Sequence, residues 1–186
     1  LYELSAPLGM NVSNPMGDDE SELIAEFISG LSFAREVDAH LLAGWCVVAP
    51  VCGALSWRPH IWLTGAAGTG KSWVFQNVVR SMLGACCLSV QGETSEAGLR
   101  QSLGHDAIPV VFDEAEGEDK RNQDRMQAVM ALMRAASAED GGVMAKGTSS
   151  GTAKTYRIRS CFAFASIAVQ VHQQSDRTRE IGRAHV

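Results

Sequence analysis

The stretch IWLTGAAGTGKSWVF, Ile61 to Phe75, most constrains what this chain can fold into. A short apolar run leads into a glycine-rich segment, and apolar residues at helical spacing follow, which predicts a strand, a turn and a helix. The turn fits the pattern G-x-x-x-x-G-K-[ST], with Gly65, Gly70, Lys71 and Ser72 at the fixed positions. The sequence therefore predicts a phosphate-binding loop.

Each residue type in this loop has a physical role. Glycines let the backbone curl, so that successive N–H groups can point at phosphate oxygens, and the helix start adds its positive end. We expect Lys71 to reach the β and γ phosphates of ATP and Ser72 to ligate Mg²⁺. A glycine-rich turn that binds nothing is the alternative. The expected nucleotide-binding residues are Gly65, Ala66, Ala67, Gly68, Thr69, Gly70, Lys71, Ser72 and Trp73.

Two carboxylates follow a second apolar run, PVVFDEAE. Val110 to Phe112 lead directly into Asp113 and Glu114, which places both carboxylates at the carboxyl end of a predicted strand, where open α/β sheets bind ligands. We expect Asp113 to hold Mg²⁺ and Glu114 to orient and deprotonate an attacking water. A solvated acidic loop is the alternative, because the charged stretch continues, and we assign Glu116 to that loop.

The order of the other predicted elements favours a parallel sheet covered on both faces. We expect a helix capped by Asp18 or Asp19, a second helix from about Asp38, and a helix after the phosphate loop. Further strands are predicted in ACCLSV and KTYRIRSCFAFASIAV, with a short helix in EAGLRQSL. Four residues form one face of a long helix and are expected in the core: Met126, Val129, Met130 and Met133.

Composition sets outer limits on the function. With 186 residues, of which 46% are hydrophobic, the chain can form one α/β domain with a sizeable core. A net charge of -5 gives no global basic surface, so any polyanion would have to be met locally. The five cysteines lie in apolar surroundings without metal-ligand spacing, which is typical of core residues in a reducing cytoplasm.

One segment, Leu41 to Leu55, is apolar enough to raise the question of a membrane span. It is shorter than the roughly 20 residues that a span needs, and Pro50 and two glycines interrupt it. We expect a buried helix that ends near Pro50, with a membrane-spanning helix as the alternative.

The predicted domain organisation has four parts. Residues 1–17 are a linker or loop, 18–57 a helical lead-in, and 58–179 a core that we expect to be truncated at its C-terminal end. The final heptapeptide, EIGRAHV, is what a common sequencing adapter encodes when it is read in frame. We therefore expect residues 180–186 to be a non-native tail and the native chain to continue beyond Arg179.

The segments GAAGTGKS and VVFDEAE resemble the Walker A and Walker B motifs of P-loop ATPases. The acidic pair is similar to that of AAA+ proteins and superfamily-3 helicases, in which the glutamate is the catalytic base. The arrangement from about Asp38 to Arg179 resembles the helicase half of phage and prophage primase-helicases. The resemblance implies an α/β fold, namely a P-loop NTPase three-layer sandwich with a mostly parallel central sheet, preceded by helices.

The same resemblance implies further roles. Basic residues ahead of the last core strand would face single-stranded or duplex DNA, with a solvent-exposed hairpin face as the alternative: Lys146, Lys154, Arg157 and Arg159. Ser166 occupies the place of the polar sensor, where such helicases usually have asparagine. Arg177 or Arg179 resembles an arginine finger supplied to a neighbouring subunit, although both could be ordinary surface arginines.

We therefore expect Mg²⁺-dependent ATP hydrolysis in a cytoplasmic, ring-forming DNA helicase, with no membrane association. The expected catalytic residues are Lys71, Glu114, Ser166, Arg177 and Arg179. Three alternatives remain: a P-loop small-molecule kinase, an AAA+ ATPase that remodels a protein partner, and a nucleotide-binding interaction module without turnover. The glycine spacing disfavours a Rossmann dinucleotide site, and the absence of an LSGGQ-like segment disfavours a transporter ATPase.

Overall fold

The computed structural model describes residues 13–115, 120–138, 143–147, 153–167 and 180–185. Its elements, in chain order, are α1 (Asp18–Ser29), α2 (Glu36–Val48), η1 (Ala49–Ala54), β1 (His60–Thr64), α3 (Lys71–Val74), η2 (Phe75–Val79), α4 (Arg80–Leu83), η3 (Gly84–Cys86), β2 (Leu88–Gln91), α5 (Glu96–Leu103), β3 (Val110–Asp113), α6 (Lys120–Ser137), β4 (Val143–Gly147), β5 (Ala153–Arg157), β6 (Phe162–Ser166) and β7 (Glu180–His185).

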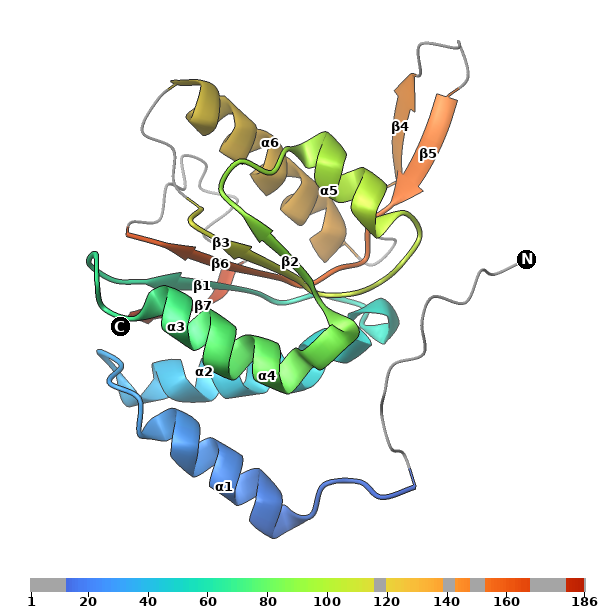
Figure 1. Cartoon of the computed structure of the whole chain (residues 1–186). Coiled ribbons are helices and arrows are strands. Elements are labelled where there is room, and N and C mark those ends of the chain that lie inside the picture. Colours follow the sequence, from blue (N-terminus) through green and yellow to red (C-terminus); the bar gives the residue numbers. More distant parts are fainter. Residues whose placement is uncertain (1–12, 116–119, 139–142, 148–152, 168–179, 186) are drawn as a thin grey trace.

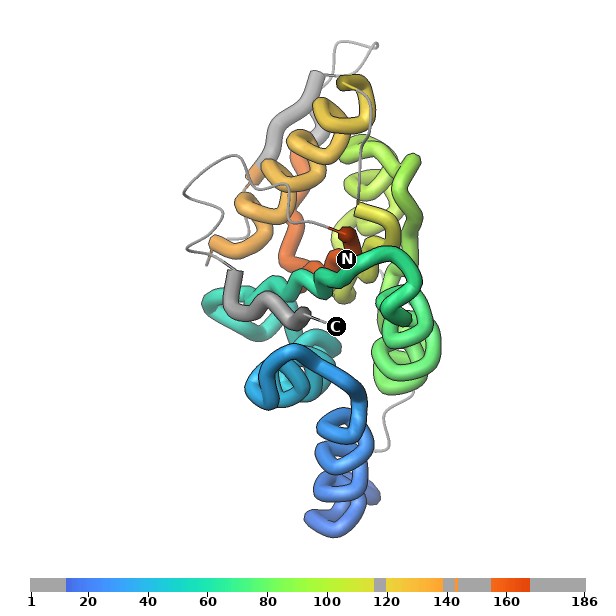
Figure 2. The backbone as a smooth tube through the Cα atoms, turned by 90° about the vertical axis from the view of Figure 1, so that its left-hand side faces the viewer, coloured from blue at the N-terminus to red at the C-terminus, as the bar shows by residue number. Residues whose placement is uncertain are grey.

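Five parallel strands form the central sheet, in the order β2-β3-β6-β1-β7. Helices α2, α3 and α4 cover one face, and α5 and α6 cover the other (Figure 1). Figure 2, turned by a quarter turn, shows the same layering, with α1 outside α2. The predicted α/β fold, a three-layer sandwich with a mostly parallel sheet preceded by helices, is confirmed.

Alternate residues of the central strands enter two separate cores. Ile61 and Leu63 of β1 face α2, α3 and α4, whereas Trp62 faces α5 and α6. This alternation follows from the two-residue period of a strand. Trp62 stacks on Phe164 with ring centroids 4.9 Å apart, and Phe164 in turn contacts Phe112 at 5.7 Å. The predicted core face of α6 is confirmed, because all four of its residues are buried: Met126, Val129, Met130 and Met133.

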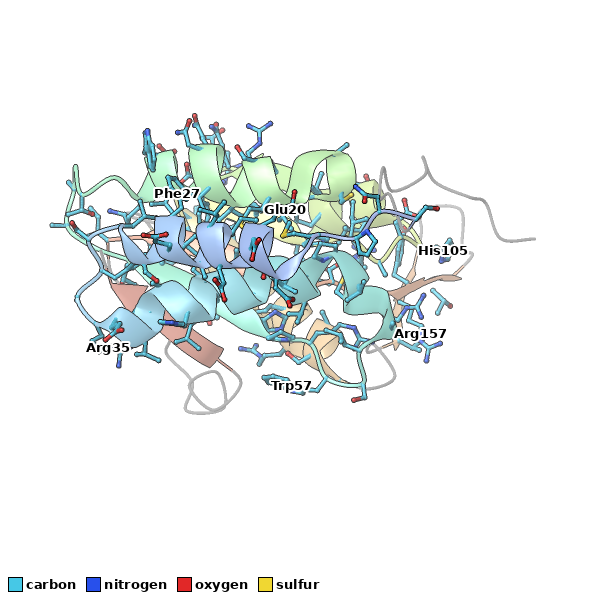
Figure 3. All side chains as sticks on the ribbon, turned by 90° about the horizontal axis from the view of Figure 1, so that it is seen from below. Glu20, Phe27, Arg35, Trp57, His105 and Arg157 are labelled. Carbon is cyan, nitrogen blue, oxygen red and sulfur yellow. The ribbon has the colours of Figure 1, made fainter. Side chains whose placement is uncertain are left out.

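The two lead-in helices lie outside the sheet layer. The prediction that Asp18 or Asp19 caps α1 is wrong, because Gly17 is the N-cap residue and both aspartates lie in the first helical turn. The Glu20 carboxylate accepts a hydrogen bond from the Gly17 N–H at 3.0 Å, which satisfies one of the free amides of the helix start. Helix α1 leaves Phe27 55% exposed on the side seen in Figure 3.

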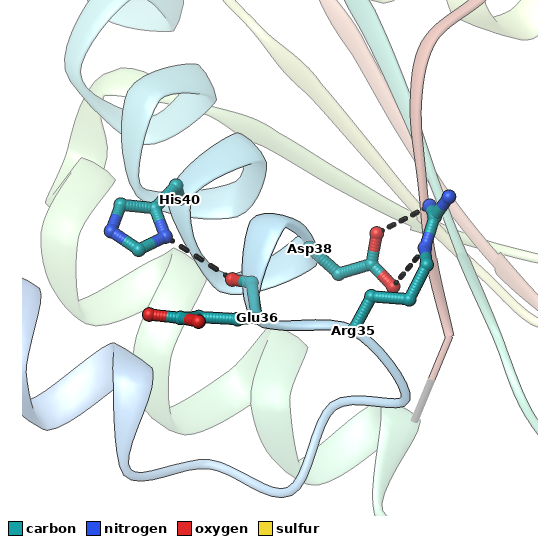
Figure 4. Close-up of polar contacts among 4 residues, drawn as sticks. All are labelled: Arg35, Glu36, Asp38 and His40. Atoms are coloured by element: carbon teal, nitrogen blue, oxygen red, sulfur yellow. Dashed lines mark hydrogen bonds and ion pairs between the residues drawn. The ribbon is translucent and has the colours of Figure 1, made fainter.

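The first turn of helix α2 contains a buried carboxylate. Asp38 is fully buried and accepts hydrogen bonds from Arg35 Nη2 at 2.5 Å and Nε at 3.2 Å (Figure 4). This contact raises the pKa of the Arg35 guanidinium. The contact of His40 Nδ1 with the Glu36 carbonyl, at 3.1 Å, lies within the same helix.

Helices α2 and η1 form a helical stretch, Glu36–Ala54, that is long and apolar enough to cross a membrane by length and composition alone. The core helix of a soluble protein passes the same test, so this is weak evidence for a span. In this structure Leu42, Trp45 and Cys46 are buried in the core that also contains Ile61 of β1. The helix ends at Val48, close to the predicted end near Pro50.

Three of the five cysteines, Cys46, Cys52 and Cys161, are buried, and all five are free thiols. Burial raises the pKa of the Cys46 thiol to about 12. A hydrogen bond with Cys52, together with burial, raises the pKa of Cys161. The prediction that the cysteines are core residues is confirmed for these three, whereas Cys86 and Cys87 are only half-buried.

Strands β4 and β5 form an antiparallel hairpin that is separate from the central sheet. In Figure 1 the hairpin projects at the opposite end of the molecule from the loop between β1 and α3. The sequence predicts strands at β5 and β6, but not at β4.

Residues Glu180–His185 form β7, which pairs in parallel with β1. Because this strand lies at the edge of the sheet, the order of the other four strands does not depend on it. That these residues are a non-native tail stays a prediction, as do the other predicted domain boundaries.

A buried cation and a buried imidazole fix the C-terminal end of α6 to the start of β1. Arg58 is 1% exposed, and its Nη1 donates to the Ala136 and Ala138 carbonyls at 3.1 and 2.6 Å. His60 Nε2 lies 2.6 Å from Ser137 Oγ, and His60 Nδ1 accepts from the Phe162 amide at 3.1 Å. Arg58 thereby satisfies carbonyls that a helix end leaves without partners.

We expect Arg58→Ala to destabilise the fold, because the substitution removes both hydrogen bonds and leaves buried carbonyls unsatisfied. The free energy of unfolding should fall by roughly 2–4 kcal/mol, measured by urea denaturation. Arg80→Ala, which removes an exposed cation from α4, is the control and should change it by less than about 0.5 kcal/mol. Equal stability of the two variants would contradict the capping role.

Candidate functional site

A cavity of about 540 Å³ lies at the carboxyl ends of the central strands. It brings together the phosphate loop, the loop after β2, the end of β3 and the first turns of α6. The residues that line it are Ala67, Lys71, Ser72, Gly92, Glu93, Asp113, Glu114, Asn122, Arg125, Ala165 and Ile167. An open α/β sheet binds its ligands at this edge.

The loop between β1 and α3 has the backbone conformation that its glycines permit. Gly68 and Gly70 have φ angles of 79° and 91°, in the region that residues with a Cβ rarely adopt. Lys71 is the first residue of α3, and its Nζ donates to the Gly65 carbonyl at 2.7 Å and the Ala66 carbonyl at 2.9 Å. The ammonium group therefore lies over the loop, where it can turn to an incoming phosphate.

Two predicted magnesium ligands, from different elements, meet in the cavity. Ser72 Oγ, in the first turn of α3, donates to Asp113 Oδ1 at 3.2 Å, and the same oxygen accepts from the Glu114 N–H at 3.0 Å. Among the described residues no group of three or more histidine, cysteine, aspartate or glutamate side chains could hold a metal ion. Mg²⁺ is typically held by one or two protein oxygens together with substrate phosphates, so this pair fits Mg²⁺.

The backbone of Glu114 is strained. Its φ of 56° lies in the left-handed region, and among the described residues other than glycine it alone has a positive φ. Such a conformation costs on the order of 1–3 kcal/mol and is concentrated at functional sites. Gly92 permits it, because a Cβ at that position would lie 2.8 Å from the Glu114 carbonyl oxygen. The exposed Glu114 side chain lines the cavity.

The structure does not bring all of the predicted site residues to the cavity. Ser166 is 1% exposed and its hydroxyl accepts a hydrogen bond from Trp62 Nε1 at 2.7 Å, whereas its neighbours Ala165 and Ile167 line the cavity. Trp73 is 51% exposed and does not line the cavity. The catalytic role of Ser166 and the nucleotide-binding role of Trp73 stay predictions.

The predicted DNA-binding and arginine-finger residues lie elsewhere. Lys146 and Lys154 belong to the β4–β5 hairpin, with Arg157 at its end and Arg159 just beyond it. Arg177 and Arg179 lie outside the described residues. Arg157 and Arg159, whose side chains the structure describes, do not line the cavity.

Four polar or glycine positions of the cavity were missed from the sequence: Gly92, Glu93, Asn122 and Arg125. Gly92 and Glu93 directly follow β2. The sequence predicts a strand there, and residues that follow a parallel strand lie at the carboxyl edge of the sheet, so this position could have indicated them. Asn122 and Arg125 lie three residues apart in α6, so they share a helix face. Their position soon after the acidic pair is the signal that could have found them.

A second cavity, of about 380 Å³, lies at the amino end of β1. Its lining includes Trp45, Val48, Leu55 and Trp57, and contains no aspartate, glutamate, lysine or arginine among the described residues. Trp57 is labelled in Figure 3. Because it lacks charged groups, this cavity does not suit a phosphate ligand.

No protein-family model matches this chain, and no curated protein matches it. Among solved structures, the Thermotoga maritima RuvB Holliday junction branch migration motor is 15% identical, with a TM-score of 0.47, covering 86% of this chain. The JCV helicase is 11% identical, with a TM-score of 0.49, covering 94% of this chain. The matches cover 49% and 47% of those two chains. At these scores the likeness adds no argument, and the fold assignment rests on the strand order and the loop.

We expect Gly92→Ala to destabilise the fold by about 1–3 kcal/mol, because the new Cβ would overlap the Glu114 carbonyl oxygen. Gly44→Ala is the matched control, since a Cβ there meets nothing within 4 Å and Gly44 lies in α2. The free energy of unfolding of Gly44→Ala should rise by about 0.5–1 kcal/mol. Urea denaturation of both variants tests the contact, and an unchanged Gly92→Ala protein would contradict it.

Proposed function

We propose that this chain is the ATPase core of a P-loop motor protein that binds ATP with Mg²⁺ and hydrolyses it. The observation that carries the proposal is the 3.2 Å contact between Ser72 and Asp113 in a cavity also lined by Lys71 and Glu114. Phosphate binding, metal binding and a candidate base thus occur at one site. A glycine-rich turn that binds nothing would have no need of this arrangement.

The described residues divide the chemistry among them. The loop amides and Lys71 would hold the β and γ phosphates, and Ser72 and Asp113 would hold Mg²⁺, which neutralises charge on those phosphates when bound. Glu114 would take a proton from the attacking water. As this happens, the water oxygen bonds to the γ-phosphorus, and the bond between the γ-phosphorus and the bridging β,γ-oxygen breaks. The products are ADP and inorganic phosphate, and the water supplies both the oxygen and the proton that Glu114 accepts.

The hairpin supports DNA as the partner of the motor. Lys146 and Lys154 occupy directly opposed positions in the β4–β5 register. A basic residue on each strand of the hairpin is a feature by which the phosphate backbone of DNA can be met. Two further basic residues, the exposed Arg157 and the half-buried Arg159, follow in the same segment.

Cations also gather at the base of the hairpin. Burial lowers the pKa of Arg58, and the positive charges of Arg159 and Arg157 lower it further, so the three guanidinium groups share one region. Figure 3 places Arg157 and His105 at the same end of the molecule. A local basic region of this kind can meet phosphates although the chain as a whole carries a net charge of -5.

Helix α5 fixes the hairpin to the core. The Arg100 guanidinium lies 4.4 Å from the centroid of the Tyr156 ring in β5, and Arg100 Nε donates to Glu96 at 2.8 Å. Both Arg100 and Glu96 are largely shielded from solvent. A cation held by a carboxylate on one side and an aromatic face on the other gives the hairpin a defined position.

The order of the sequence motifs supports a more specific assignment of the protein. We propose a cytoplasmic, ring-forming primase-helicase of phage or prophage type, in which Arg177 or Arg179 serves the ATP site of a neighbouring subunit. The order of the two Walker segments, the hairpin between them and the last core strand, and the basic residues of that hairpin support this assignment. The alternatives are an ATPase that remodels a protein partner, a small-molecule kinase and a binding module.

Two substitutions test the ATP site. Lys71→Ala should abolish ATP hydrolysis, because it removes the cation that meets the β and γ phosphates. Glu114→Gln should still bind ATP and hydrolyse it about 10²–10⁴ times more slowly, because it removes the base. Steady-state phosphate release and nucleotide binding distinguish them, with Glu22→Gln on exposed α1 as the control. ATP hydrolysis retained in Lys71→Ala would contradict the assignment of the ATP site. Loss of ATP binding in Glu114→Gln would show a structural role for Glu114.

A third measurement tests the partner. Single-stranded DNA should stimulate hydrolysis by the full-length protein, and the double substitution Lys146→Ala/Lys154→Ala should weaken DNA binding. The slope of log affinity against log salt should then fall by about 1–2. Arg80→Ala removes a distant exposed cation and is the control. Hydrolysis that DNA leaves unchanged would favour a remodelling ATPase, and phosphate transfer to an acceptor hydroxyl would favour a kinase.

A further inference from the structure

Helix α6 contributes two polar side chains to the nucleotide cavity, and the chemistry described above uses neither. Asn122 and Arg125 line the cavity together with Lys71, Asp113 and Glu114. They lie three residues apart, so one face of the first turns of α6 points into the cavity. The neighbouring Arg121 is exposed and does not line it.

Arg125 has a donor that the fold does not satisfy. Its Nε is buried and has no hydrogen-bond partner among the described residues. A buried donor without an acceptor costs about 1–3 kcal/mol, and such groups are rare enough that each needs an explanation. By contrast, Arg100 Nε, in α5, donates to Glu96 at 2.8 Å. Arg125 also lines the cavity, and a turn of its side chain toward the cavity would bring this donor to an anionic ligand.

The strand beside the phosphate loop presents no polar side chain to this part of the cavity. β6 contributes Ala165, and Ile167 follows it, whereas the hydroxyl of Ser166 is bonded to Trp62 Nε1. Any contact with the terminal phosphate beyond those of Lys71 and Mg²⁺ would therefore come from an element other than β6. Helix α6 starts soon after Asp113 and Glu114 in the chain, and its first turns line the same cavity as these two carboxylates, beside which the terminal phosphate would react.

We infer that Arg125 binds the γ-phosphate of ATP and makes the site distinguish ATP from ADP. The inference rests on the proposed function, because it requires a nucleoside triphosphate in this cavity. Guanidinium suits the role, since it remains charged and presents several donors to phosphate oxygens in a fixed geometry. Asn122, on the same helix face, lies beside Arg125 in the lining.

The test compares binding of two nucleotides to the full-length protein. Affinities for ADP and for the slowly hydrolysed analogue ATPγS, each with Mg²⁺, are measured by calorimetry for the wild type, Arg125→Ala, Arg125→Lys and Arg121→Ala. Arg125→Ala should weaken ATPγS binding by roughly 10- to 100-fold and leave ADP binding within about two-fold. Arg125→Lys keeps the charge and should recover part of the loss, and Arg121→Ala should bind both nucleotides as the wild type does.

Each other outcome has a defined meaning. Equal losses for ADP and ATPγS, or no loss for either, would overturn the role of Arg125 and leave the proposed ATP site intact. A wild-type protein that binds neither nucleotide would overturn the proposed function, and this inference with it. The thermal midpoint of unfolding without nucleotide identifies a variant that fails to fold. If Arg125→Ala fails to fold, Arg125→Lys tests the contact in its place. At an unchanged midpoint, a weaker preference of Arg125→Lys for ATPγS over ADP supports the contact, and an unchanged preference refutes it.

Discussion

The turn between β1 and α3 is the constraint on which the rest of the site depends. β1 pairs directly with β6, and the chain leaves its carboxyl end through Gly68 and Gly70, whose φ angles are positive. This backbone path directs α3 back over the sheet and starts it at Lys71, beside the end of β3. The meeting of Ser72 with Asp113 follows from that geometry, because a differently directed turn would separate two residues 41 positions apart.

Much of the fold could be predicted from local pattern. The helix after the loop and the methionine face of α6 follow a helical period, and the apolar runs at β1 and β3 are too short for a buried helix and are bounded by turn or charged residues. The hairpin was only half predicted, because KGTSSG has the composition of a loop and β4 is defined only by its pairing with β5. The start of α1 was misplaced because aspartate is favoured both as an N-cap and in the first turn.

The residues of the candidate site also fall into those that the sequence indicates and those that only the fold brings together. Gly65, Gly70, Lys71, Ser72, Asp113 and Glu114 belong to two motifs whose spacing is fixed within the chain, so the sequence indicates them directly. Gly92 is needed only because Glu114 approaches it across the loop ends, and Arg125 enters the cavity only because α6 begins where it does. Ser166 shows the converse case: its position in the strand was predicted, but its hydrogen bond to Trp62 depends on the pairing of β6 with β1.

Helix α6 runs from the candidate site to the amino end of β1. Its first turns carry Asn122 and Arg125, and its last turn is held by Arg58 and His60 at the amino end of β1. Its buried face packs on the aromatic row of the sheet, and β4 of the hairpin begins six positions after its last residue. Because close-packed interiors transmit strain, a displacement at the cavity end of α6 would alter its packing against the sheet.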